Sequence, residues 1–113
     1  METKELMIGD KVMVKVLSQI PDTYVLHTWT ANDYSRDLQV KPIPLTTEII
    51  EKNGWWYAID DLWLHDGVSF CIEKCNGKFQ CYDISQIKLH SVHQLQQTLR
   101  LCGLNELADN FKV

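Results

Sequence analysis

Residues 55–84 read WWYAIDDLWLHDGVSFCIEKCNGKFQCYDI, and this stretch decides the fold. It holds three of the four tryptophans and three of the four cysteines of the chain. Asp66-Gly67 and Asn76-Gly77 are dipeptides typical of two-residue hairpin turns, because both central positions of a type I′ turn need a positive φ. The stretch therefore predicts a three-stranded antiparallel meander.

Counting outward from the two turns predicts the register of the meander. Trp63 should oppose Phe70 across the first turn, and Ile72 should oppose Cys81 across the second. Directly opposed residues lie on one face of a sheet. Residues 55–59 would add a further strand if Asp60-Asp61 turns sharply. One face, the better candidate for the core, then carries Trp63, His65, Val68, Phe70, Ile72, Phe79 and Cys81, and the other carries Leu62, Leu64, Cys71, Glu73, Cys75 and Tyr82.

Three more strands are predicted in the N-terminal half. Residues 11–17 alternate valines with other side chains, which is typical of a half-buried strand. Residues 23–29 are rich in β-branched and aromatic residues, and a turn at Pro21-Asp22 would let the two strands pair. In the second strand, Val25, His27 and Trp29 should share one face.

The segment from residue 30 to residue 41 is predicted to be mostly irregular. TANDYSRD, residues 30–37, is polar and lacks a period, so we expect an exposed loop. Residues 38–41 form a short strand that the following prolines, Pro42 and Pro44, confine to an edge or an end of a sheet.

Helices are predicted in the middle and at the end of the chain. Thr46 is a suitable N-cap for a short helix that stops at Asn53-Gly54. Ser91 and Gln94 have the spacing of a capping box and start a longer helix that ends at Gly103. A last turn over residues 105–110 should dock Leu104, Leu107 and Phe111.

The chain has 113 residues, of which 45% are hydrophobic, a size and composition typical of one compact domain. We therefore predict a single α+β domain over residues 1–113. Its antiparallel sheet should be strongly bent, partly closed in the first half like an SH3-type barrel, and carry the C-terminal helix across one face.

Charge and hydropathy limit the classes of partner. Lys and Arg number 11 against 15 Asp and Glu, and neither sign is gathered in blocks. This balance disfavours nucleic acid as a partner, because such binding depends on cations that neutralise phosphates. No window approaches a membrane span, and no signal-peptide core follows the N-terminus. We therefore expect a cytoplasmic protein that does not enter membranes, with reduced thiols.

Cys71, Cys75 and Cys81, with His65 or His90, are residue types that zinc prefers. The predicted register separates them, since Cys71 and Cys75 lie roughly 13 Å apart along one strand. Cys81 falls on the opposite face, and no CxxC pair exists. The pattern therefore favours free thiols, and we predict no metal site and no cofactor.

Catalytic patterns are not evident in the sequence. No nucleophile-elbow glycines surround the serines, and neither a P-loop nor a dinucleotide fingerprint is present. We therefore expect no enzymatic activity. His93 should be exposed on the last helix and His90 should lie at a strand end. A small enzyme with a site around His65, His90 and His93 stays open as an alternative.

Trp55 and Trp56 are adjacent in a predicted strand, so their side chains point to opposite faces. Unless both faces are covered, one indole lies at the surface, where aromatic residues often bind partners or stack on bases. Trp29 and Tyr34 are further candidate binding residues. They would serve, with Lys11 and Lys15, in a nucleic-acid-binding alternative built on the small barrel.

Three segments carry a resemblance to a known group of proteins: ELMIGDKV at 5–12, KPIPLTTEIIEKNGW at 41–55 and HSVHQLQQTL at 90–99. In this order they resemble small proteins of unknown function encoded in gut-bacterial genomes, often in prophages and other mobile elements. The chain departs from that pattern at residues 99–101, where Leu-Arg-Leu replaces an aromatic run. The resemblance implies no activity, ligand or catalytic residue.

The leading hypothesis is a non-enzymatic accessory or adaptor protein of a phage or mobile element that acts through protein contacts. It rests on the absence of catalytic motifs, the adjacent tryptophans and the resemblance. The partner would be another protein or a second copy of the chain.

Overall fold

The computed structural model describes residues 1–15, 23–84 and 87–113, which form two antiparallel sheets and several helices. The α+β class is thus confirmed. The first sheet has the strand order β2-β1-β3 and the second β4-β5-β6-β7. The strands are β1 (Lys11–Lys15), β2 (Tyr24–Thr28), β3 (Val40–Lys41), β4 (Trp56–Tyr57), β5 (Leu62–Leu64), β6 (Ile72–Cys75) and β7 (Lys78–Cys81).

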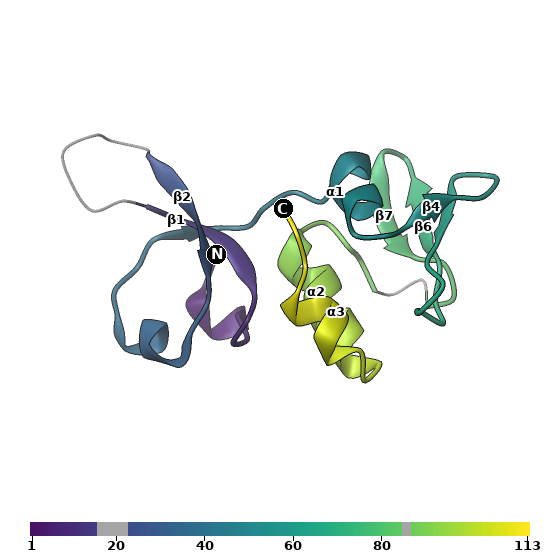
Figure 1. Ribbon diagram of the computed structural model, residues 1–113. Coiled ribbons are helices and arrows are strands. Elements are labelled where there is room, and N and C mark those ends of the chain that lie inside the picture. The colour runs from purple at the N-terminus through teal and green to yellow at the C-terminus, as the bar shows by residue number, and fades with distance from the viewer. Residues whose placement is uncertain (16–22, 85–86) are drawn as a thin grey trace.

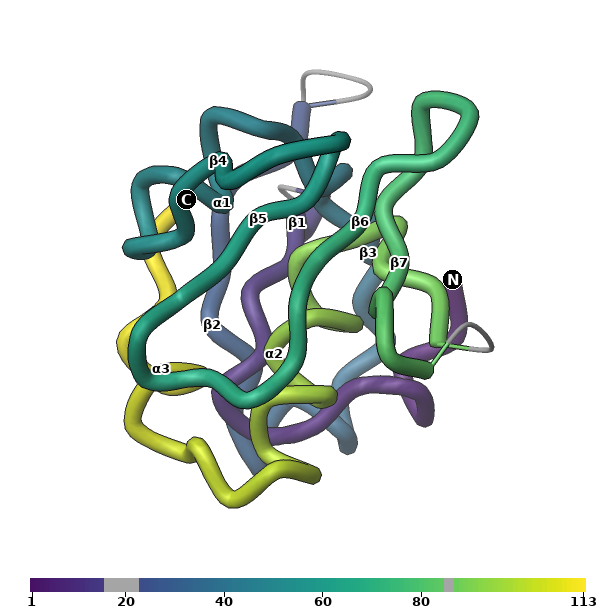
Figure 2. Tube along the Cα trace, turned by 90° about the vertical axis from the view of Figure 1, so that its right-hand side faces the viewer, coloured from purple at the N-terminus to yellow at the C-terminus, as the bar shows by residue number. Residues whose placement is uncertain are grey.

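The sheets lie at opposite ends of an elongated molecule (Figure 1). Figure 2, viewed from the end with the four-stranded sheet, shows α2 behind β5 and β6, with β1 and β2 farther back. The expectation of one bent, partly closed sheet is therefore corrected, since the described strands form two open sheets. The helices are α1 (Thr47–Lys52), α2 (Val92–Leu101) and α3 (Asn105–Asp109), with two 3-10 helices, η1 (Thr3–Glu5) and η2 (Ala31–Ser35).

The three-stranded sheet follows from the alternating valines of β1. Val12 and Val14 are buried, and β1 pairs with β2 as predicted. Val25 lies opposite Val14 but remains 47% exposed, because β2 is an edge strand. Residues 16–17 and the predicted turn at Pro21-Asp22 lie outside the described part of the chain. The small core of this sheet consists of Leu6, Val12, Val14, Trp29 and Val40, with Leu38 packed against it.

The predicted loop over residues 30–37 contains η2, which corrects that expectation. Thr30 and Asp33 form a capping box, in which each side chain binds the backbone of the other residue. Asp33 is 2% exposed and also accepts a hydrogen bond from the ring of His27, at 2.7 Å. The Thr-x-x-Asp spacing in the sequence could have predicted this capping box, but the polar composition of residues 30–37 favoured an exposed loop.

Asp33 gives a pH-dependent prediction. Burial by itself would raise the pKa of Asp33, but hydrogen bonds from His27 and Thr30 and the charge of His27 lower it to about 2. Because this pKa lies below the value in the unfolded chain, the ionised carboxylate stabilises the fold above about pH 4. This contribution, on the order of 2 kcal/mol, is lost as the pH falls from about 4 to 2.

Asp33→Asn should therefore unfold at lower urea concentration than the wild type at pH 7, and the two should converge toward pH 2.5. The neighbouring exposed Asp37→Asn serves as the control and should match the wild type throughout. A difference for Asp33→Asn that stays constant with pH would contradict the assigned role of the carboxylate.

The four-stranded sheet confirms one hairpin turn and corrects the other. Asn76 and Gly77 have φ values of 53° and 78°, and Ile72 faces Cys81 as predicted. The sharp turn at Asp60-Asp61 also forms, with φ values of 52° and 60°. Asp66-Gly67 does not form a type I′ turn, since neither residue has a positive φ.

Trp63 consequently faces Ile72 rather than Phe70. This slip of two residues keeps the same side chains on the core face, because side chains alternate with a period of two. Tertiary packing outweighs the local turn preference of Asp66-Gly67, since the wider loop brings Phe70 against Trp55, with ring centroids 5.6 Å apart. All predicted core-face residues are buried except His65 and Val68, which are partly buried.

The helices begin and end where their caps predict. The Thr46 hydroxyl accepts a hydrogen bond from the Ile49 N–H, and Ser91 and Gln94 form the predicted capping box of α2. Gly103 follows α2 with a φ of 78°. The inner face of the four-stranded sheet and the three helices enclose the main core, whose largest fully buried members are Ile50, Ile72, Leu89, Leu95 and Leu99.

Candidate functional site

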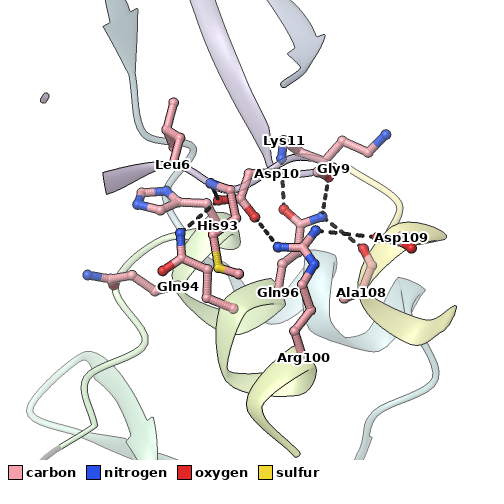
Figure 3. Close-up of polar contacts among 12 residues, drawn as sticks. Leu6, Gly9, Asp10, Lys11, His93, Gln94, Gln96, Arg100, Ala108 and Asp109 are labelled. Carbon is pink, nitrogen blue, oxygen red and sulfur yellow. Dashed lines mark hydrogen bonds and ion pairs between the residues drawn. The ribbon is translucent and has the colours of Figure 1, made fainter. Parts of the chain in front are cut away.

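Polar side chains of α2 join the two ends of the molecule (Figure 3). Asp10, just before β1, is fully buried and its Oδ1 accepts a hydrogen bond from Arg100 Nη1. Its Oδ2 accepts from the Met7 N–H at 2.9 Å and from Gln97 Nε2 at 2.7 Å. Arg100 also lies 3.5 Å from Asp109 of α3. We refer to Asp10, Gln96, Gln97 and Arg100 as the polar cluster.

Gln96 is the centre of this arrangement and is fully buried. Its Oε1 accepts a hydrogen bond from the Lys11 N–H at 2.8 Å. Its Nε2 donates to the carbonyls of Gly9, at 3.0 Å, and Ala108, at 2.8 Å. One side chain thus holds the entrance to β1, helix α2 and helix α3 together.

The three segments that carry the sequence resemblance meet around this cluster. Residues 5–12 contact α2 through Gln96, Gln97 and Arg100. Residues 41–55 contact the start of α2 through backbone hydrogen bonds from Leu45 N–H to His90 C=O and from Val92 N–H to Ile43 C=O. These contacts bring residues 5–12 and 41–55 against α2, although the segments lie far apart in the sequence.

Exposed aromatic residues mark a second feature, at the edge of the four-stranded sheet. Trp56 is 47% exposed, whereas its neighbour Trp55 is 3% exposed, as the alternation of strand side chains requires. Tyr57 and Ile59 are also exposed, and Leu64 lies opposite Trp56. Trp56 and Leu64 face one side of the sheet and Tyr57 faces the other. With Ile59 they line both sides of the open edge of β4, and we refer to these four residues as the β4–β5 patch.

The outer face beside this patch is open. None of its residues is buried, and four of the six are partly buried. These residues are Leu62, Leu64, Cys71, Glu73, Cys75 and Tyr82.

The other candidate binding residues are less accessible. Trp29 is fully buried, and its Nε1 has no hydrogen-bond partner among the described residues. Tyr34 is 46% exposed, but its ring packs edge-on against Trp29 at 5.7 Å and its hydroxyl donates to the Leu6 carbonyl. Neither Trp29 nor Trp55 offers a free face to a base or a partner, so the nucleic-acid alternative lacks its central stacking residue.

The three histidines of the enzyme alternative occupy two cavities. His65 lines one with Trp55, whereas His90 and His93 line another with Ser91 and Glu5. A site that uses all three imidazoles therefore does not form.

His93 is 6% exposed, which corrects the expectation of an exposed helix position. Burial lowers its pKa, against the opposing effect of Asp10 and Glu5. Met1 and Glu5 of the N-terminal arm line the same cavity as His93, so the arm lies over this side of α2.

The cysteines remain free thiols. Cys81 is buried opposite Ile72, and burial, with Cys102 and Asp83 nearby, raises its pKa to about 11. Burial and Asp83 also raise the pKa of Cys71. Within residues 1–15, 23–84 and 87–113, no group of three or more His, Cys, Asp or Glu side chains is placed to hold a metal ion.

None of the helices in the described part of the chain has the length and apolar character that crossing a bilayer needs. Comparison of the chain with protein-family models, curated proteins and solved structures found no match in any of the three.

Sequence reasoning did not identify the polar cluster. Asp10 stands alone before the predicted strand at residues 11–17, and Arg100 appeared only in the Leu-Arg-Leu segment that departs from the resemblance pattern. A signal was available in the helical spacing, because Gln96 lies four residues after Val92 and three before Leu99, on the apolar face of α2, and must therefore be largely covered. Two of its partners, Gly9 and Lys11, lie more than 80 residues away and could not be read from the pattern.

Proposed function

We propose that this chain is a non-enzymatic accessory or adaptor protein of a phage or mobile element and that it binds a protein partner through the β4–β5 patch. The observation that carries the proposal is the exposed indole of Trp56 beside Tyr57 on an edge strand. Tryptophan and tyrosine are the residues most enriched among those that dominate binding energy at protein interfaces. The mobile-element origin rests on the sequence resemblance alone.

The geometry of β4 supports strand addition as the mode of binding. As an edge strand, β4 has backbone groups on one side that no strand of the described chain pairs. An extended peptide that pairs with these groups gains main-chain hydrogen bonds, and the neighbouring side chains supply specificity. Tyr57 is fixed for this role, because its ring packs on Trp63 at 5.1 Å and its hydroxyl accepts from the Asp61 N–H.

The size of the Trp56 contribution can be estimated. A tryptophan side chain buries about 150–250 Å² when it is fully covered. Covering the exposed half of Trp56 thus removes on the order of 100 Å² from water, which contributes roughly 2–3 kcal/mol at the usual area coefficient. This corresponds to a change in the dissociation constant of about 30- to 150-fold.

Trp56→Ala should therefore weaken capture of the cognate partner at least tenfold, with thermal unfolding unchanged. The matched control is Tyr82→Ala, which removes an aromatic residue that is 53% exposed and lies outside the patch. Capture on immobilised protein, followed by a titration with the purified partner, measures the effect. Equal binding by Trp56→Ala and the wild type would refute the assigned surface. Sedimentation of the free chain as a dimer that Trp56→Ala abolishes would identify a second copy of the chain as the partner.

A further inference from the structure

Strand β2 has an unpaired outer edge. It lies at one end of the strand order β2-β1-β3, and no other strand in the described part of the chain pairs with that side of it. Two of its apolar side chains, Val25 and Leu26, are 47% and 51% exposed. Since β2 and the β4–β5 patch belong to different sheets, an interaction at this edge is independent of the proposed function.

Backbone hydrogen bonds show which groups of β2 point outward. The Trp29 N–H donates to the Asp10 carbonyl at 2.8 Å, so Trp29 bonds toward β1. Because bonded and non-bonded residues alternate along antiparallel strands, His27 and Val25 also bond toward β1. Lys11 agrees with this alternation, since it opposes a non-bonded residue of β2 and its N–H binds a side chain of α2 instead. The N–H and C=O groups that point away from β1 therefore belong to Tyr24, Leu26 and Thr28.

The edge of β2 lacks the features that usually prevent strand pairing. Residues 23–30, TYVLHTWT, contain no proline, glycine, lysine, arginine or acidic residue. Their one histidine, His27, is bound to Asp33 of the same chain at 2.7 Å. Charged side chains and prolines commonly block an open edge. The opposite edge strand, β3, has both, with Lys41 inside it and Pro42 directly after it, whereas β2 has neither and can pair.

The outward groups of β2 are complementary to those of a second copy. When two copies run antiparallel about a two-fold axis at Leu26, Leu26 opposes itself and Tyr24 opposes Thr28. In this register every outward residue meets an outward residue, so each opposed pair exchanges two hydrogen bonds. The exposed Leu26 side chains meet at the axis, and no charged residue of β2 opposes another. One edge is sufficient for such an interface, because the same residues supply both halves of it.

We propose that the chain forms a symmetric dimer through antiparallel pairing of β2 with β2 of a second copy, which joins the two three-stranded sheets into one. An interface one strand wide is small, at the end of the size range where complexes are weak and transient. We therefore expect a dissociation constant on the order of 100 µM.

Lysines beside the edge make the dimer sensitive to salt. Lys11 Nζ donates to the Thr28 hydroxyl at 2.6 Å, and Lys41 Nζ lies 4.2 Å from the centre of the Tyr24 ring. Because Thr28 opposes Tyr24 of the second copy, pairing brings lysines of the two copies toward each other. Added salt screens this repulsion and should tighten the dimer on the order of twofold. A dimer that weakens with salt would depend on opposite charges and would contradict this pairing.

The test measures association and locates it in the full chain. Sedimentation equilibrium from about 10 µM to about 1 mM should show a monomer–dimer equilibrium. Amide hydrogen exchange, followed by NMR, should be about threefold slower at about 1 mM than at about 50 µM for the outward residues Tyr24, Leu26 and Thr28. The inward residues Val25 and His27 should exchange at the same rate at both concentrations.

Two variants of Leu26 test the register. Leu26→Pro removes the central outward N–H, and an edge strand tolerates proline where the N–H faces solvent. Leu26→Lys places two ammonium groups opposite each other at the axis. Both should weaken dimerisation at least tenfold with the circular dichroism spectrum unchanged. The matched control Leu101→Lys adds the same charge at a leucine of α2 that is 83% exposed, and it should dimerise like the wild type.

Trp56→Ala separates this interface from the β4–β5 patch and should also dimerise like the wild type. The proposal is overturned if the wild type stays monomeric up to about 1 mM or if both Leu26 variants dimerise as it does. It is also overturned if Trp56→Ala alone abolishes the dimer, which would place the second copy on the β4–β5 patch.

Discussion

Replacing Arg100 by methionine should lower the free energy of unfolding by about 3–5 kcal/mol, the typical cost of removing one partner from a buried ion pair. The Asp10 carboxylate is fully buried, and only 9% of the Arg100 side chain is exposed. Methionine is close to arginine in length and fills most of the same space, so the lost packing is small. The cost arises because the carboxylate stays buried with only the Met7 and Gln97 donors to compensate its charge.

Equilibrium unfolding in urea, followed by circular dichroism, measures this effect. Asp109→Asn is the matched control, since it removes the other carboxylate near Arg100, which is 3.5 Å away and 60% exposed. An exposed pair of this kind contributes at most about 1 kcal/mol. The double variant Asp10→Asn/Arg100→Met should recover part of the loss, because the unpaired charge is then absent. A loss below 1 kcal/mol for Arg100→Met would show that the pair does not hold the two sheets together.

The two Asx-Gly dipeptides show how far local pattern determines this fold. At Asn76-Gly77 the strands on both sides pair directly, and the turn takes the positive φ values that its sequence favours. At Asp66-Gly67 neither residue has a positive φ, and the wider loop carries Phe70, which packs on Trp55 with ring centroids 5.6 Å apart. The predicted core face is nevertheless correct, because the strand register differs from the predicted one by an even number of residues.

The candidate binding residues also show which features follow from local pattern and which depend on tertiary contacts. Alternation along a strand predicted that one of Trp55 and Trp56 would be exposed if the sheet was not covered on both sides, and β4 follows this rule. Which of the two is exposed depends on which face of the sheet α2 covers, and Leu95 and Leu99 of α2 belong with Trp55 to the main core. The order of the three segments along the chain did not indicate why residues 5–12 lie against α2. The reason is a set of hydrogen bonds from side chains of α2 to backbone groups of residues 5–12.

Gln96→Leu should destabilise the protein by about 2 kcal/mol or more, because two backbone groups lose their partner at once. The Lys11 N–H and the Gly9 carbonyl would each lose the Gln96 hydrogen bond while partly or fully buried, whereas the Ala108 carbonyl also accepts from the Phe111 N–H at 3.3 Å. Leaving one such group unsatisfied costs about 1–3 kcal/mol. Leucine matches the size of glutamine and suits a helix, so helix propensity does not account for a loss of this size.

Gln96→Glu separates the role of the donor from that of the acceptor. The introduced carboxyl keeps an acceptor for the Lys11 N–H, but when ionised it places oxygen against the Gly9 and Ala108 carbonyls. Burial and these carbonyls favour its protonated form and so raise its pKa in the folded state. Its penalty should then be small near pH 4 and should grow as the pH rises toward 8. A Gln96→Glu variant as stable as the wild type at pH 8 would mean that the Nε2 bonds do not hold β1 and α3 against α2.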